Sequence, residues 1–250
     1  MKKISLLCLA ATLFFLTSCE TTRDITIDSN GSGKIVTTID MSQLAGIAKM
    51  SGQGKEMEGK KMDSTISLAA LADSIPDLAP QERELLKKGT MGMVVNLDEE
   101  KMLTNISFPF NSVADINNVQ KLSGTLLQQM MKKEMQSQAG VPGGMPDDQM
   151  PQTSFEGYYN TTFAPGVIES KLDKEKYAKV ADDKAIQGMK EAVDQGMPIV
   201  NRYVFHLPKP AKKVEGAGAK LSDDKKTVTV EGDMSDFFDD ASKLEFRIEY

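Results

Sequence analysis

Side chains suited to acid–base or metal chemistry are scarce in this 250-residue chain. It contains one histidine, His206, and two cysteines, Cys8 and Cys19. A Ser/His/Asp triad therefore has one candidate base, and zinc sites usually need several Cys and His ligands. His206 belongs to an alternating segment whose opposite face carries Tyr203 and Phe205. We expect His206 on the solvated side of a strand, and the sequence predicts no catalytic residue, no metal ligand and no cofactor-binding residue.

The nearest approach to a nucleotide motif lies at residues 54–61. A Gly, four further residues and Gly-Lys follow the order of a phosphate-binding loop, but Lys61 stands where Ser or Thr would hold Mg²⁺. No predicted strand precedes the segment, and Glu56 and Glu58 would repel phosphate. The segment is therefore interpreted as a charged loop.

Methionines and carboxylates are the other two groups with chemistry of their own. Thioethers suit Cu(I), and five methionines cluster in the chain: Met130, Met131, Met135, Met145 and Met150. The first three have the spacing of a helix core, where Met commonly fills gaps. Acidic pairs could serve glycoside hydrolysis or Ca²⁺ binding. However, Asp223-Asp224 reads as a solvated turn, and Asp233 or Ser235 more simply caps a short helix ending at Asp240.

The first nineteen residues are the most informative part of the sequence. Lys2 and Lys3 precede an apolar run over residues 4–16, which is too short to cross a bilayer but fits a secretory signal. The closing Leu16-Thr17-Ser18-Cys19 resembles the lipobox of bacterial lipoproteins. That resemblance implies a signal peptide over residues 1–18, cleavage before Cys19, and acylation of the Cys19 thiol and new amino group.

A lipoprotein of this kind is anchored to the lipid bilayer through Cys19 and faces the periplasm or the cell surface. Glu20 follows the cysteine. The resemblance implies that an Asp there would favour retention in the inner membrane, so Glu20 favours the outer membrane. Cys8 leaves with the signal, so the mature chain, residues 19–250, has neither a free thiol nor a disulfide.

The charge of the mature chain excludes one class of partner. Removing Lys2 and Lys3 from the 30 basic residues leaves 28 against 36 acidic ones, a net charge of about −8. Nucleic-acid binding needs a basic face that releases counterions, so we expect no nucleic-acid partner.

Strands dominate the predicted elements. Residues 24–27 and 34–39 flank the turn chemistry of Asn30-Gly31 and predict a hairpin, and residues 91–97 and 102–108 predict a second one. Further strands are expected at 155–163, 167–172, 199–207, 227–231 and 244–250. Their strict alternation favours an antiparallel sheet with one buried face.

Helices are expected between these strands. Pro80 and Gly89 bracket one, and Ser112 with Asp115 forms a capping-box signature for a long helix to about residue 136. A short helix is expected over residues 64–74, and a second long one from Asp173 to Gly196. The alternating strand at residues 244–250 is expected to bury its apolar side against the two long helices.

Residues 51–63 and 139–153 are rich in Gly and charge, or in Gly and Pro, and are predicted as flexible loops. The sequence therefore predicts an α+β fold: an antiparallel β-sheet of hairpins with helices packed on one face, in one mature domain over residues 19–250.

The two ends of the mature chain resemble a known domain. The opening hairpin around Asn30-Gly31-Ser32-Gly33 and the ending, with its strand at residues 227–231, short acidic helix and final strand, are similar to the LppM-type domain of bacterial lipoproteins. The resemblance implies an α+β domain with a cupped, lipid-binding sheet.

These observations favour a non-catalytic envelope lipoprotein that binds an apolar ligand or a protein partner. Two alternatives stay open: an envelope hydrolase that uses carboxylates, and a structural subunit of an envelope complex. An apolar cavity, converging acids and an exposed apolar patch, respectively, would separate the three.

Overall fold

The computed structural model describes residues 19–42, 46, 61–72, 75, 78–137, 155–196 and 198–250. The predicted signal peptide (residues 1–18), the predicted loop at 139–153 and most of the one at 51–63 lie outside these ranges.

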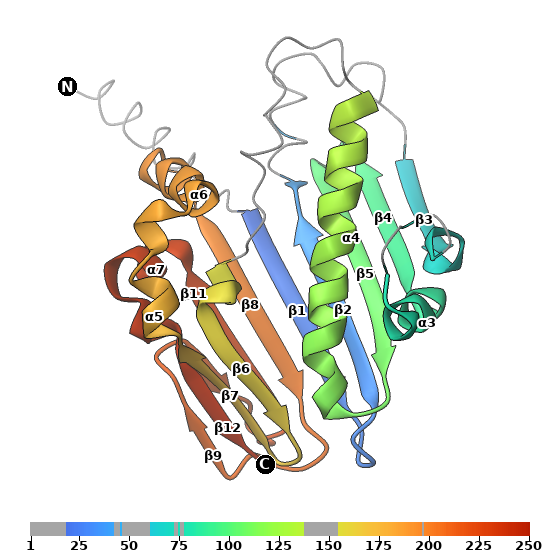
Figure 1. Cartoon of the computed structure of the whole chain (residues 1–250). Helices are drawn as coiled ribbons and strands as arrows, with labels where there is room; N and C mark the ends of the chain where they lie inside the picture. Colours follow the sequence, from blue (N-terminus) through green and yellow to red (C-terminus); the bar gives the residue numbers. More distant parts are fainter. Residues whose placement is uncertain are drawn as a thin grey trace, which may run out of the picture.

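An eight-stranded sheet forms the base of the molecule (Figure 1). Its strand order is β10-β11-β8-β1-β2-β5-β4-β3, and neighbouring strands are antiparallel except for the parallel pair β1 and β8. The strands are β1 (Cys19–Ile27), β2 (Gly33–Asp40), β3 (Lys61–Ser67), β4 (Thr90–Asn96), β5 (Lys101–Phe110), β8 (Ile199–His206), β10 (Ala219–Leu221) and β11 (Thr227–Asp233).

A second sheet of four antiparallel strands packs beside the first. Its order is β6-β7-β12-β9, with β6 (Tyr159–Ala164), β7 (Val167–Leu172), β9 (Lys213–Glu215) and β12 (Phe246–Glu249). The short 3₁₀ helix η6 (Phe155–Tyr158) leads directly into β6.

The helices lie on one face of the large sheet (Figure 1). The long helix α4 runs in front of β1, β2 and β5, while α5, α6 and α7 gather beside the small sheet. The helices are α3 (Pro80–Lys88), α4 (Ile116–Ser137), α5 (Lys174–Tyr177), α6 (Lys184–Asp194) and α7 (Met234–Asp240). The predicted fold class, an α+β fold with an antiparallel sheet and helices on one face, is confirmed.

The described residues form three buried hydrophobic clusters, and the two larger ones hold these layers together. The larger one joins the eight-stranded sheet to α4 and the small sheet through residues such as Phe205, Leu122 and Ile248. The smaller one is an aromatic cluster centred on the fully buried Phe237, whose ring lies 5.3 Å from that of Tyr177 and 5.5 Å from that of Tyr158.

Local turn and cap chemistry was predicted correctly. Asn30-Gly31 turns β1 into β2, with Gly31 at a φ of 84°, a conformation that glycine adopts without strain. Pro80 begins α3 and Gly89 follows its last turn. The Ser112–Asp115 capping box forms at the turn that leads into α4, and Asp233 caps α7.

The expected helix over residues 64–74 is wrong. Residues 61–67 form β3, which pairs with β4 from Lys61↔Asn96 to Ser67↔Thr90, and only a 3₁₀ turn at Leu68–Leu71 follows. Pairing with a neighbouring strand supplies backbone hydrogen bonds that outweigh the modest helix propensity of the segment. The first residues of β3, Lys61 to Asp63, also belong to the strand and not to the loop predicted for residues 51–63.

The expected long helix from Asp173 to Gly196 is interrupted. The Asp183 carboxylate accepts hydrogen bonds from the backbone N–H groups of Ala185 and Ile186, so it starts α6 as a new helix after α5. Aspartate competes in this way with a continuous helix because its side chain bonds to nearby backbone N–H groups.

The final strand was predicted correctly as a strand, and its apolar side chains join the larger core, to which α4 also contributes. β12 lies in the small sheet between β7 and β9, and its Phe246 ring packs 5.8 Å from Phe205 and 6.1 Å from Tyr203 of β8. Its apolar side therefore closes the space between the two sheets.

Candidate functional site

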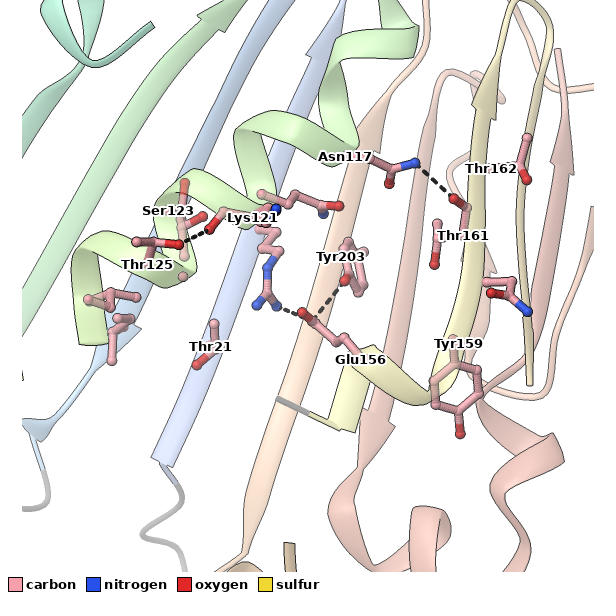
Figure 2. Close-up of a pocket in the computed structure, with 18 of the residues that line it drawn as sticks. Thr21, Asn117, Lys121, Ser123, Thr125, Glu156, Tyr159, Thr161, Thr162 and Tyr203 are labelled. Carbon is pink, nitrogen blue, oxygen red and sulfur yellow. Dashed lines mark hydrogen bonds and ion pairs between the residues drawn. The ribbon is translucent and has the colours of Figure 1, made fainter. Parts of the chain in front are cut away.

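A cleft of about 940 Å³ opens between α4 and the β6 side of the small sheet, with β1, β2 and β8 below it (Figure 2). We call it the α4–β6 cleft. It lies between the two hydrophobic cores, because Leu127 on one wall packs on the larger core and Met189 on the smaller one.

One end of the cleft is closed by a direct contact between its walls. The Asn117 side chain of α4 donates a hydrogen bond of 3.0 Å to the backbone carbonyl of Thr161 on β6 (Figure 2). The opposite end points toward the start of β1, where Thr21 pairs with Ile39 two residues from Cys19.

The side chains along the cleft are not uniform. Near the Cys19 end, Ile39, Leu127 and Met189 contribute apolar surface; we call this end the mouth. Between the mouth and the Asn117–Thr161 contact lie Arg23, Gln120, Glu156 and Tyr203, which we call the polar cluster. The remaining lining residues are mostly hydroxyl and amide side chains: Thr21, Thr37, Asn117, Lys121, Ser123, Gly124, Thr125, Gly157, Tyr159, Asn160, Thr161 and Thr162.

The polar cluster is built on paired strands of the large sheet. Arg23 of β1 is directly opposite Tyr203 of β8, and its guanidinium lies 5.4 Å from the centre of the Tyr203 ring. Arg23 Nη1 is 2.5 Å from Glu156 Oε1, and the Tyr203 hydroxyl donates to the same oxygen at 2.7 Å. The Arg23 and Glu156 side chains are only 14% and 24% exposed, so this ion pair is largely withdrawn from water.

Burial and the ion pair set the protonation of this cluster. Burial alone would lower the pKa of Arg23, but the Glu156 carboxylate and Tyr203 raise it, and the net change is upward. Burial, followed by the nearby Glu156 charge, raises the pKa of Tyr203 well above its usual range. Arg23 is therefore a cation and Tyr203 a neutral hydrogen-bond donor at any physiological pH.

Gln120 adds a donor that the cleft does not satisfy. Its Nε2 is buried, and no acceptor meets it in hydrogen-bonding geometry among the residues that the structure describes. The amide nitrogen lies near the Tyr203 hydroxyl, and this weak hydrogen bond lowers the pKa of the phenol, against the larger upward effects. The contact falls outside good hydrogen-bonding geometry and an amide nitrogen carries two N–H donors, so Gln120 can take a further acceptor.

The residues singled out from the sequence lie elsewhere. Cys19 is the first residue of β1. His206 sits on the uncovered face of the large sheet, 3.1 Å from Asp24 Oδ2 and 3.4 Å from Thr227 Oγ1, which agrees with the predicted strand face. Asp223-Asp224 lies between β10 and β11, as expected of a turn.

Across the described ranges, no three His, Cys, Asp or Glu side chains gather as metal ligands. No described helix combines the length and apolar character needed to cross a bilayer.

Sequence reasoning missed the polar cluster. Its one visible signal is Arg23, a charged residue on the face of β1 that otherwise carries Thr21, Ile25 and Ile27. Glu156 follows Arg23 by more than 130 positions, and Gln120 lies in an unrelated helix, so no spacing rule links them.

The chain matches no protein-family model, no curated protein and no solved structure. The resemblances to lipoproteins and to the LppM-type domain therefore stay predictions, and function is argued from the cleft.

Proposed function

We propose that the chain is an exported lipoprotein of the cell envelope, of the outer membrane rather than the inner one, that binds a ligand without catalysis. Acylated Cys19 anchors it, and an amphiphile occupies the α4–β6 cleft. The observation that carries the proposal is the mixed lining of that cleft, which combines the apolar side chains of Ile39, Leu127 and Met189 with the charged and hydrogen-bonding polar cluster.

The position of Cys19 supports a site at the bilayer surface. β1 begins at Cys19, so almost no chain separates the anchor from the cleft. At about 3.3 Å per residue, Thr21 lies roughly 7 Å and Arg23 roughly 13 Å from Cys19 along the strand. Two or more acyl chains hold a protein stably on a membrane, and would keep the mouth beside the lipid head groups.

The alternatives have less support. Glycoside hydrolysis uses two carboxylates, whereas Glu156 is the single carboxylate among the described residues that line the cleft. A complex subunit would present a contiguous apolar patch. Among the described residues, the exposed large apolar side chains are Met62 and Ile66 on β3 and Leu221 on β10; these strands lie at opposite edges of the large sheet, so the three side chains form no such patch.

Two glycines provide a matched test of the cleft. Gly124 on α4 lines the cleft, and a Cβ added there would meet no atom within 4 Å. Gly188 on α6 is equally free of neighbours but does not line the cleft. Gly124→Phe should therefore place a bulky side chain at the cleft wall without a backbone clash at its Cβ, and Gly188→Phe should leave the cleft open.

The experiment is native mass spectrometry of residues 19–250, with Cys19 replaced by Ser, purified from a bacterial host without detergent. We expect a bound amphiphile in the Cys19→Ser protein and in its Gly188→Phe variant, and at least tenfold less in Gly124→Phe. Equal amounts in both variants, or none in any of the proteins, would contradict the proposal.

A further inference from the structure

We propose that the polar cluster is a subsite for the carboxylate of an amphiphilic ligand, and that Glu156 occupies it in the ligand-free protein. This inference rests on the proposed binding of an amphiphile in the α4–β6 cleft and specifies its head group.

Hydrogen-bond donors outnumber acceptors in the polar cluster. Arg23, the Tyr203 hydroxyl and Gln120 Nε2 are three donor groups within one cluster, and a guanidinium alone offers five N–H donors. Glu156 Oε1 accepts from two of these groups, and Asn201 Oδ1 lies 3.4 Å from Arg23 Nη1. Among the described residues, Gln120 Nε2 has only a weak contact with the Tyr203 hydroxyl, outside good hydrogen-bonding geometry. An added carboxylate would supply two oxygens to these donors.

The described residues that line the α4–β6 cleft carry an excess of positive charge. The charged residues that line the cleft are Arg23, Lys121 and Glu156, so the cleft carries one more positive than negative charge. The whole chain has a formal net charge of −6. A locally positive cleft in an acidic protein favours anionic ligands over cationic ones, because field lines are focused between low-dielectric walls.

A ligand carboxylate could replace the Glu156 carboxylate as the anionic partner of Arg23. Glu156 belongs to the short η6 turn and not to either sheet, whereas Arg23 is fixed within β1. A largely buried guanidinium must keep an anionic partner, since an unpaired buried charge is strongly unfavourable. A ligand carboxylate can meet this need in place of Glu156 without breaking a sheet hydrogen bond.

The apolar mouth determines the rest of the ligand. Ile39, Leu127 and Met189 would contact a tail whose carboxylate reaches the polar cluster. Each CH₂ removed from water contributes about 0.8 kcal/mol, so a long chain should bind far more tightly than a short one. The chemistry thus indicates a long-chain monocarboxylate.

The test is isothermal titration of residues 19–250, with Cys19 replaced by Ser, with three probes below their micelle concentrations: dodecanoate, butanoate and dodecyltrimethylammonium. We expect dodecanoate to bind at least tenfold more tightly than either of the others. Glu156→Gln should strengthen dodecanoate binding about five- to tenfold, because the internal competitor loses its charge. Arg23→Gln should weaken it at least tenfold.

Gln120→Leu keeps the test decisive if Arg23→Gln does not fold. It leaves the ion pair intact, removes only the unsatisfied donor, and should weaken dodecanoate binding at least threefold with an unchanged Tm. Unchanged binding in Gln120→Leu, or weaker binding in Glu156→Gln, would overturn the carboxylate subsite.

The same titrations separate this inference from the proposed function. Equal affinity for dodecanoate and dodecyltrimethylammonium, both lost in Gly124→Phe, would retain the amphiphile cleft and refute the carboxylate subsite. If neither dodecanoate nor dodecyltrimethylammonium bound, both the amphiphile cleft and the carboxylate subsite would be refuted.

Discussion

At the scale of single residues, the Arg23–Glu156 pair is the feature that packing alone does not explain. Replacing a buried ion pair by apolar side chains is often neutral or stabilising, so such a pair contributes little net stability. Arg23 nevertheless stands on a strand face shared with Ile25 and Ile27, opposite the ring of Tyr203. The proposed recognition of a ligand carboxylate would account for a charge at this position.

The tyrosines give a prediction that depends on pH. All five have a raised pKa, in each case chiefly because of burial, and Asp183 helps to raise the pKa of Tyr158 to about 12. Because the unfolded pKa is about 10, the unfolded chain loses these protons first, and the free energy of unfolding falls as the pH rises above 10.

Absorbance near 295 nm should therefore show little tyrosine ionisation in the folded protein at pH 10, followed by a steep rise that coincides with loss of the circular dichroism signal. The same titration in urea should be centred near pH 10. A smooth folded-state titration centred at the ordinary tyrosine pKa would contradict the burial of these side chains.

At the scale of elements, local chemistry predicts more than long-range pairing does. The β1–β2 and β4–β5 hairpins follow from turn residues and alternation within about twenty positions. The parallel pairing of β1 with β8 joins residues about 180 positions apart, and the same alternating pattern would suit either edge of either sheet. The second sheet and the cleft between the layers could therefore not be predicted from the sequence.

The two glutamates at the ends of β12 differ in their hydrogen-bond partners, which gives a prediction for the small sheet. The Glu245 carboxylate accepts a hydrogen bond of 3.0 Å from the backbone N–H of Leu172, whereas Glu249 pairs with Arg247 at the surface of the small sheet. Glu245→Ala should lower the free energy of unfolding by about 1–2 kcal/mol, because a part-buried backbone donor loses its charged acceptor. Glu249→Ala should lower it by less than about 0.5 kcal/mol, the usual value of an exposed pair.

Urea denaturation followed by circular dichroism measures both values. Glu245→Gln serves as the control, since its amide oxygen can still accept the Leu172 N–H, and it should recover most of the loss. Equal losses in Glu245→Ala and Glu249→Ala would show that the Glu245–Leu172 bond does not contribute to the small sheet.

At the scale of the whole molecule, the proposed anchor at Cys19 would orient the mouth of the α4–β6 cleft toward the membrane. Cys19 and the mouth of the cleft lie at one end of the large sheet, and the β1–β2 turn lies at the other. The anchor stays a prediction from the opening nineteen residues of the sequence. The orientation could not be predicted, because it depends on β1 starting at Cys19 and on α4 and β6 meeting at Asn117 and Thr161.

Two exposed positions report on that orientation. Gln195 follows α6 and lies four residues before Ile199, the strand partner of Cys19. Ser29 lies in the turn after β1, about 30 Å from Cys19 along the strand at the usual rise per strand residue. Residues 20–250 contain no cysteine, so in the proposed acylated chain Gln195→Cys and Ser29→Cys can each be labelled specifically.

The most direct test is quenching of a fluorophore at these two positions by nitroxide-labelled lipid, with the acylated protein in vesicles. The account predicts strong quenching at position 195, little at position 29, and loss of both signals when Cys19→Ala prevents anchoring. Equal quenching at the two positions, stronger quenching at position 29, or quenching that persists in the Cys19→Ala protein would contradict it.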